Sequence, residues 1–198
     1  MRSLGIDAFQ THHQVIKSQT WLEEVLAIND FLIAATLVPT VCDRVMRVSA
    51  KHERTIRHEH IAPVIPDGWI VFHITETTPV AIWLEMDMGT EQEAFFRRKI
   101  VRIIDFSNNG YEQAFGTASV IVAVATRAGD KRRQSLLTWI EKEVDYQHEP
   151  EARSIFRVTS LAPGALDPTT LFLAPVWYIP YRRHKGIYQL EPLIPVVS

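Results

Sequence analysis

The sequence contains few of the features that mark several common protein classes. Its single cysteine, Cys42, excludes an intramolecular disulfide framework and a zinc site built from several cysteines. A lone cysteine also fits a reducing, cytoplasmic setting. The longest apolar run, residues 31–38, is far too short to span a bilayer. The chain has no glycine-rich phosphate loop and no dinucleotide-binding fingerprint. We therefore expect neither a membrane protein nor a nucleotide-binding enzyme of those two kinds.

The charge of the chain is nearly balanced. With 21 basic and 23 acidic residues, the net charge is -2, so the protein as a whole does not attract nucleic acid, and binding to a polyanion must depend on local clusters. A length of 198 residues with 46% hydrophobic residues is enough for one well-buried domain. We expect that domain over residues 19–198, after a weakly patterned lead-in over residues 1–18.

The hydrophobic pattern predicts helices and strands in mixed order. Apolar positions at helical spacing predict helices over residues 18–38, 91–106 and 130–144. Short apolar runs predict strands over residues 41–48, 69–74, 80–86, 120–125, 155–159 and 171–178. We interpret the polar stretch 51–60 as an exposed edge or loop, and residues 180–198 as a basic and aromatic tail. This order of elements predicts an α/β fold in which a mixed central sheet is flanked by helices.

The stretch 82–91 is the most informative part of the chain. It reads as an apolar strand that ends in two acids, Glu85 and Asp87. Residues two apart on a strand point to the same face, so these two carboxylates should share one side of the sheet. Thr90 and Glu93 have the spacing of a capping box, which predicts that a helix begins there. A third acid, Asp67, follows a proline at the start of the preceding strand.

These acids suggest chemistry on phosphodiesters. If the two strands are neighbours, Asp67, Glu85 and Asp87 supply the hard oxygen ligands that Mg²⁺ or Mn²⁺ prefers. Lys99 borders the buried stripe of the following helix, and its ammonium could stabilise charge at a phosphate. The alternative is structural, because acids at strand ends are often solvated and a lysine at the border of a core often extends along its edge.

At these residues the chain resembles known proteins. A helix, a Pro-Asp turn, a hairpin, a strand ending acid-x-acid and a helix with an inward lysine resemble the PD-(D/E)XK nuclease superfamily. More narrowly, residues 85–91 (EMDMGTE) followed by Lys99 are similar to the plasmid replication-relaxation family, as are residues 28–33, 110–111 and 120–126. The resemblance covers roughly residues 20–145. It implies a restriction-endonuclease-like fold and a DNA-processing protein of a plasmid or mobile element, linked to replication.

Two departures from these families leave alternatives open. Where the superfamily pattern has lysine two residues after the strand acid, this chain has Asp87. Migration of the lysine to Lys99 explains the change, and so does loss of catalysis. The resemblance also implies a winged helix-turn-helix module ahead of the first helix, and only about 18 residues precede that helix here, so we do not expect autonomous sequence-specific DNA binding. A catalytically inactive module that binds DNA or a partner is the alternative, and a pure assembly protein is a third interpretation.

Local basic clusters are the candidate DNA contacts. One lies on the helix that carries Lys99, and a second comprises Arg127, Lys131, Arg132 and Arg133. The third mixes cations with tyrosines near the C-terminus, which suits phosphate contact and base stacking. The candidate residues are Arg97, Arg98, Arg182, Arg183 and Lys185. We expect DNA as the partner, together with replication or mobilisation proteins, and we consider a homodimer as the assembly.

Overall fold

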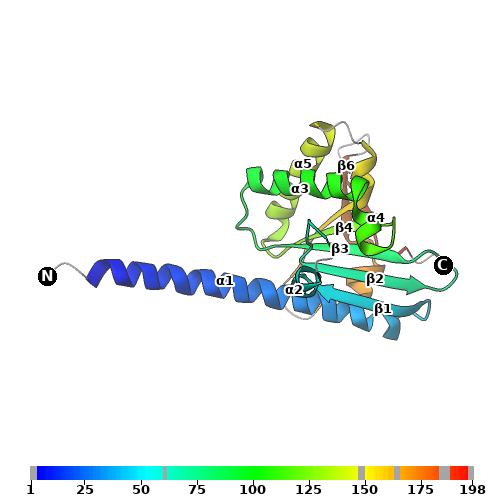
Figure 1. The fold of residues 1–198 in the computed structure, drawn as a ribbon, viewed down its shortest axis with the longest axis horizontal. Coiled ribbons are helices and arrows are strands. Elements are labelled where there is room, and N and C mark those ends of the chain that lie inside the picture. Colours follow the sequence, from blue (N-terminus) through cyan, green and yellow to red (C-terminus); the bar gives the residue numbers. More distant parts are fainter. Residues whose placement is uncertain (1–3, 60–61, 147–149, 163–165, 183–187, 196–198) are drawn as a thin grey trace.

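A seven-stranded mixed sheet forms the centre of the molecule (Figure 1). The computed structural model describes residues 4–59, 62–146, 150–162, 166–182 and 188–195. In it the strands lie in sequence order, so that each strand pairs with the next along the chain. The strands are β1 (Val45–His52), β2 (Gly68–Ile74), β3 (Val80–Asp87), β4 (Ile121–Thr126), β5 (Phe156–Ser160), β6 (Trp177–Arg182) and β7 (Tyr188–Glu191). The predicted α/β fold with a mixed sheet between helices is confirmed.

Strand directions follow from the connections. β1, β2 and β3 are antiparallel, and a short turn at residues 75–79 joins β2 to β3. β3, β4 and β5 are parallel, since helices carry the chain back between them. β6 and β7 return to antiparallel pairing at the far edge. Gly68 pairs with Leu84, so the start of β2 lies beside the end of β3, where the acids were expected.

One long helix, α1 (Leu4–Leu37), lies along one face of the sheet. The helix packs against side chains of β2, β3 and β4 on that face. The α1 residues buried there are Ala27, Ile28, Phe31, Ala34 and Ala35. Residues 4–18, which we expected to be a lead-in, belong to this helix, whose N-terminal part projects past the sheet (Figure 1). Among the described residues, no helix is both long enough and apolar enough to cross a membrane.

Two helices, α3 (Glu93–Asn109) and α5 (Gly129–Tyr146), cover the opposite face. The predicted inner stripe of α5 is confirmed, since Leu136, Leu137, Ile140 and Val144 are all buried. α3 buries its own apolar stripe in the same cluster, against Trp83 of β3. The short helix α4 (Tyr111–Phe115) follows α3 directly. The sheet is therefore the middle of three layers.

Several local predictions were wrong. The polar stretch 51–60 is not simply an edge or loop, because β1 continues to His52 and α2 (Glu53–His58) follows. The α2 helix buries a single apolar side chain, Ile56, while its remaining side chains are polar. The capping box is also absent: Gln92 occupies the N-cap of α3 and makes no side-chain cap hydrogen bond.

The C-terminal part of the chain belongs to the sheet. Residues expected as a strand over 171–178 instead begin as a π-helical turn, η3 (Thr169–Leu173), before β6 starts at Trp177. Phe172 packs against Phe31 and Phe72, which explains why these apolar residues form a turn over the α1 layer. The expected tail over 180–198 contributes the end of β6 and all of β7. Two short 3-10 helices, η1 (Val38–Thr40) and η2 (Pro150–Ile155), complete the described elements.

Candidate functional site

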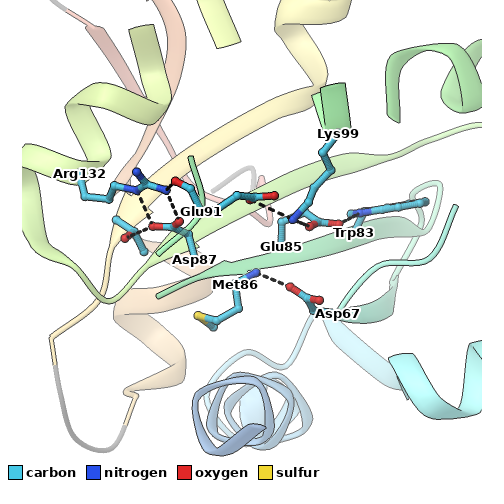
Figure 2. A network of polar contacts seen from close by, with 9 residues as sticks. Asp67, Trp83, Glu85, Met86, Asp87, Glu91, Lys99 and Arg132 are labelled. Carbon is cyan, nitrogen blue, oxygen red and sulfur yellow. Dashed lines mark hydrogen bonds and ion pairs between the residues drawn. The ribbon is translucent and has the colours of Figure 1, made fainter. Parts of the chain in front are cut away.

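The end of β3 presents acids toward the helices α3 and α5. Because side chains alternate along a strand, Trp83, Glu85 and Asp87 face this layer, while Ile82, Leu84 and Met86 face α1. The predicted shared face of Glu85 and Asp87 is confirmed. The two acids nevertheless engage different partners, as Figure 2 shows.

Glu85 is the centre of a compact charge cluster. Its side chain is only 6% exposed, and one oxygen, Oε1, accepts a 2.7 Å hydrogen bond from the indole N–H of Trp83. The other oxygen lies 3.1 Å from Nζ of Lys99 on α3. The same ammonium lies 3.3 Å from a carboxylate oxygen of Glu91, in the loop that joins β3 to α3. Lys99 therefore reaches back to the strand as predicted, and it is held between two carboxylates.

Asp67 lies beside this cluster at the start of β2. Its Oδ2 accepts a 2.7 Å hydrogen bond from the backbone N–H of Met86, so the side chain is fixed against β3 (Figure 2). Burial raises the pKa of the Asp67 carboxyl well above its ordinary value, and the neighbouring negative charge of Glu85 raises it further. The Met86 N–H and Lys99 act in the opposite direction with smaller effect. Asp67 and Glu85 therefore crowd negative charge into one place.

A fourth acid, Glu24, approaches the cluster from α1. Burial raises the pKa of its carboxyl, Lys99 lowers that pKa, and the nearby charges of Glu85 and Glu91 raise it. Sequence reasoning missed this residue, although Glu24 precedes Ile28 and Phe31 by four and seven positions and so lies on the buried stripe of the helix. Together with Asp67, the cluster holds four carboxylates and one ammonium, and full ionisation would leave a net charge of -3.

Asp87 belongs to a different network. Its carboxylate accepts two hydrogen bonds from Arg132 of α5, at 3.0 Å from Nε and 2.7 Å from Nη2, and one of 2.6 Å from the Thr126 hydroxyl. Arg132 also donates to the backbone oxygen of Glu91 at 2.7 Å and packs over the Trp139 ring. This bidentate pair fixes the loop that carries Glu91. Sequence reasoning placed Arg132 in a basic cluster but did not link it to Asp87, because nothing local connects the two residues.

The structure therefore does not assemble the expected set of three metal ligands. Asp67 and Glu85 are brought together, but the charge of Asp87 is balanced by Arg132. Within the described part of the chain, no group of three or more His, Cys, Asp or Glu side chains is arranged to hold a metal ion. If a divalent cation binds here, Asp67 and Glu85 would be its carboxylate ligands, since Mg²⁺ is commonly bound by one or two carboxylates together with water and phosphate oxygens. The excess negative charge of the cluster favours such an ion.

The candidate DNA-binding residues have unlike surroundings. Arg97 is engaged by Glu143, with Nε 2.7 Å from a carboxylate oxygen. Arg98 is exposed and packs over the ring of Phe95, 4.5 Å from its centroid. Arg182 ends β6 and its side chain lies outside the described part, as do residues Arg183 and Lys185 altogether.

Comparison with known proteins bears on the identity of the chain. The family model described as replication-relaxation matches residues 6–121, which is more than half of the chain and runs from α1 to the start of β4. The matched range contains Glu24, Asp67, Glu85 and Lys99. No curated protein and no solved structure shows a significant match. The family suggests a role in the replication or relaxation of plasmids or mobile elements. The chain thus belongs to the replication-relaxation family.

Proposed function

We propose that this protein processes DNA during the replication of a plasmid or mobile element, and that the cluster of Asp67, Glu85 and Lys99 hydrolyses phosphodiester bonds with the help of Mg²⁺ or Mn²⁺. One observation carries the proposal. Two carboxylates crowd together at the end of β3, and a lysine from the next helix lies 3.1 Å from one of them. A buried acid with a raised pKa beside a charged partner is typical of functional sites.

The order of elements supports a nuclease-like core. α1 precedes an antiparallel meander of β1, β2 and β3, and α3 then leads to β4, which is parallel to β3. Pro66 and Asp67 stand at the start of β2, and Lys99 points from α3 toward the acids of β3. These are the features by which the sequence resembles the PD-(D/E)XK superfamily, and their arrangement supports the proposal.

Each side chain has a role that follows from its contacts. Mg²⁺ bound by Asp67 and Glu85 would polarise a phosphoryl oxygen and lower the pKa of an attacking water. Lys99 places a positive charge beside the same carboxylates, where it can stabilise the charge that develops on phosphate. The indole N–H of Trp83 fixes one oxygen of Glu85, so that this carboxylate keeps one orientation. Arg132 holds the Glu91 loop and so positions Lys99 indirectly.

The direct test measures cleavage of supercoiled, linear and single-stranded DNA in Mg²⁺ and in Mn²⁺. We expect cleavage by the wild type and a loss of at least 100-fold in Glu85→Gln and in Lys99→Met. Glu76→Gln is the matched control, because Glu76 is exposed in the turn at the other end of the β2–β3 hairpin. Cleavage that persists unchanged in Glu85→Gln would place the activity elsewhere.

A second candidate function is a catalytically inactive module that binds DNA or a replication partner. The ion pair between Asp87 and Arg132 favours it, because the position two residues after Glu85 then serves to hold the structure together. This module would bind DNA with unchanged affinity in Glu85→Gln and would cleave no substrate. Absence of cleavage in the wild type, with DNA affinity intact, would decide for it.

A further inference from the structure

A hollow of about 710 Å³ lies at the C-terminal end of α3, where that helix meets α4. Its volume is within the usual range for small-ligand sites. The segment before β2 forms one wall with Pro63 and Val64, and α3 and α4 form the rest. A second hollow of about 410 Å³ shares Asn109, Gly110 and Gln113 with the first. The proposed site above uses none of these residues.

The lining combines an apolar wall with groups that donate and accept hydrogen bonds. Phe106 and Val64 supply the apolar wall, and Asp105 supplies a carboxylate. Asn109 donates from Nδ2 to the Asp105 side chain at 2.9 Å and to its backbone oxygen at 3.0 Å, which leaves the Asn109 side-chain carbonyl as an acceptor. The Gln113 side chain makes no hydrogen bond with any described residue, so its amide can both donate and accept. Such a mixture suits the edge of a nucleobase, with its ring against the apolar wall.

Two elements contribute residues both to this hollow and to the cluster of Asp67, Glu85 and Lys99: the helix α3 and the segment that leads into β2. Arg102 lines the hollow and lies three residues after Lys99, so the two cations are neighbours on one side of α3, about 4.5 Å apart along the helix axis. Val64, on the opposite wall, precedes Asp67 by three residues. Within the described part of the chain, Arg102 forms no ion pair. A strand whose phosphate lies at Lys99 can therefore place its next phosphate at Arg102.

We propose that this hollow binds an unpaired nucleobase of single-stranded DNA, next to the phosphate held at Lys99, with Arg102 on the neighbouring phosphate. The inference rests on the proposed function, which it deepens by naming an unpaired strand as the substrate. A base in a duplex is stacked and cannot enter a hollow without leaving the helix.

The test measures binding, so that it is independent of cleavage. A fluorescein-labelled single-stranded octanucleotide, with or without one abasic position, is titrated in EDTA, and anisotropy gives the Kd. We expect the best-placed abasic site to weaken wild-type binding about tenfold, as the loss of one base contact would. Arg102→Ala and Gln113→Leu should each weaken binding of the intact strand about tenfold, and the abasic site should have little further effect in Gln113→Leu.

The control is Lys142→Ala, which removes an exposed cation from α5 outside the hollow and should leave the Kd within twofold. An unaltered melting temperature shows that each variant is folded. The proposal is overturned if no abasic position weakens binding, if Arg102→Ala behaves like Lys142→Ala, or if duplex DNA binds as tightly as the single strand. Absence of cleavage with the abasic effect intact would refute the hydrolytic function and leave the base site standing. Cleavage that survives in Gln113→Leu with unaltered affinity would refute the base site and leave the hydrolytic function standing.

Discussion

Replacing Lys99 with methionine tests whether the charge cluster at β3 is held by this one ammonium. Methionine keeps much of the aliphatic chain and removes the charge, so Glu85 and Glu91 lose the cation that lies 3.1 and 3.3 Å from them. Glu85 would then be a carboxylate that is only 6% exposed and stands beside Asp67 without a positive partner. We expect the folded state to be destabilised.

The contacts set the size of this effect. At an effective dielectric constant of about 20, Coulomb's law assigns roughly 5 kcal/mol to each contact, but most of this is offset by the cost of removing the ions from water. Breaking a fully buried pair costs about 3–5 kcal/mol. The Lys99 side chain is 36% exposed, so solvent screens part of the interaction. We therefore expect a loss of about 2–3 kcal/mol, which for a chain of this size lowers the Tm by roughly 5–10 °C.

Urea denaturation followed by tryptophan fluorescence at pH 7.5 measures the loss. Lys142→Met is the control, because Lys142 is exposed on α5 and should change stability by less than about 0.5 kcal/mol. Glu85→Gln in the Lys99→Met background should be neutral or stabilising, since it removes the unbalanced charge. If Lys99→Met unfolds at the wild-type urea concentration, or if the two substitutions are simply additive, the ammonium does not hold the cluster and the reasoning fails.

Three further predictions concern neighbouring groups. Because the pKa of Asp67 is raised in the folded state, the folded protein binds this proton more tightly than the unfolded chain, and stability falls as pH rises above the ordinary carboxyl range near 4. Asp67→Asn should therefore raise the unfolding free energy by about 1 kcal/mol at pH 7.5 in EDTA and not at pH 4. An equal gain at both pH values would contradict a raised pKa at Asp67. Arg132→Gln should cost about 3 kcal/mol, because it leaves the buried Asp87 without its bidentate partner, whereas Arg98→Gln should cost almost nothing in the same melts. Tyr111→Phe should cost about 1–2 kcal/mol by chemical denaturation, since the buried indole N–H of Trp69 would lose its 3.1 Å bond to the hydroxyl. Burial raises the pKa of Tyr111 to about 12, so in the wild type stability should fall as pH rises above about 10, and the same fall in Tyr111→Phe would refute this attribution.

Local pattern was sufficient for much of the sheet. β2, β3 and β4 are short runs of apolar and β-branched residues, and such runs are typical of strands that are buried on both faces of a sheet. The inner stripe of α5 also follows from spacing alone. The polar stretch 51–60 was misjudged because the helix α2 buries only Ile56, which leaves almost no periodic signal to detect. The start of α1 was misjudged because residues 1–18 show little of the apolar periodicity that marks a helix in sequence.

The candidate site divides in the same way. Two features followed from sequence separation and helical or strand geometry: Glu85 and Asp87 share a face, and Lys99 points back toward them. Which acids act together did not follow. Asp87 is neutralised by Arg132, which lies 45 residues later in the sequence. Glu24 belongs to α1, which precedes β1, β2 and β3 in the sequence. The sequence alone determined where the charged residues stand along each element, because backbone periodicity is local. Only the tertiary structure decided which charges are paired and which remain crowded, because that depends on the elements that pack against one another across the chain.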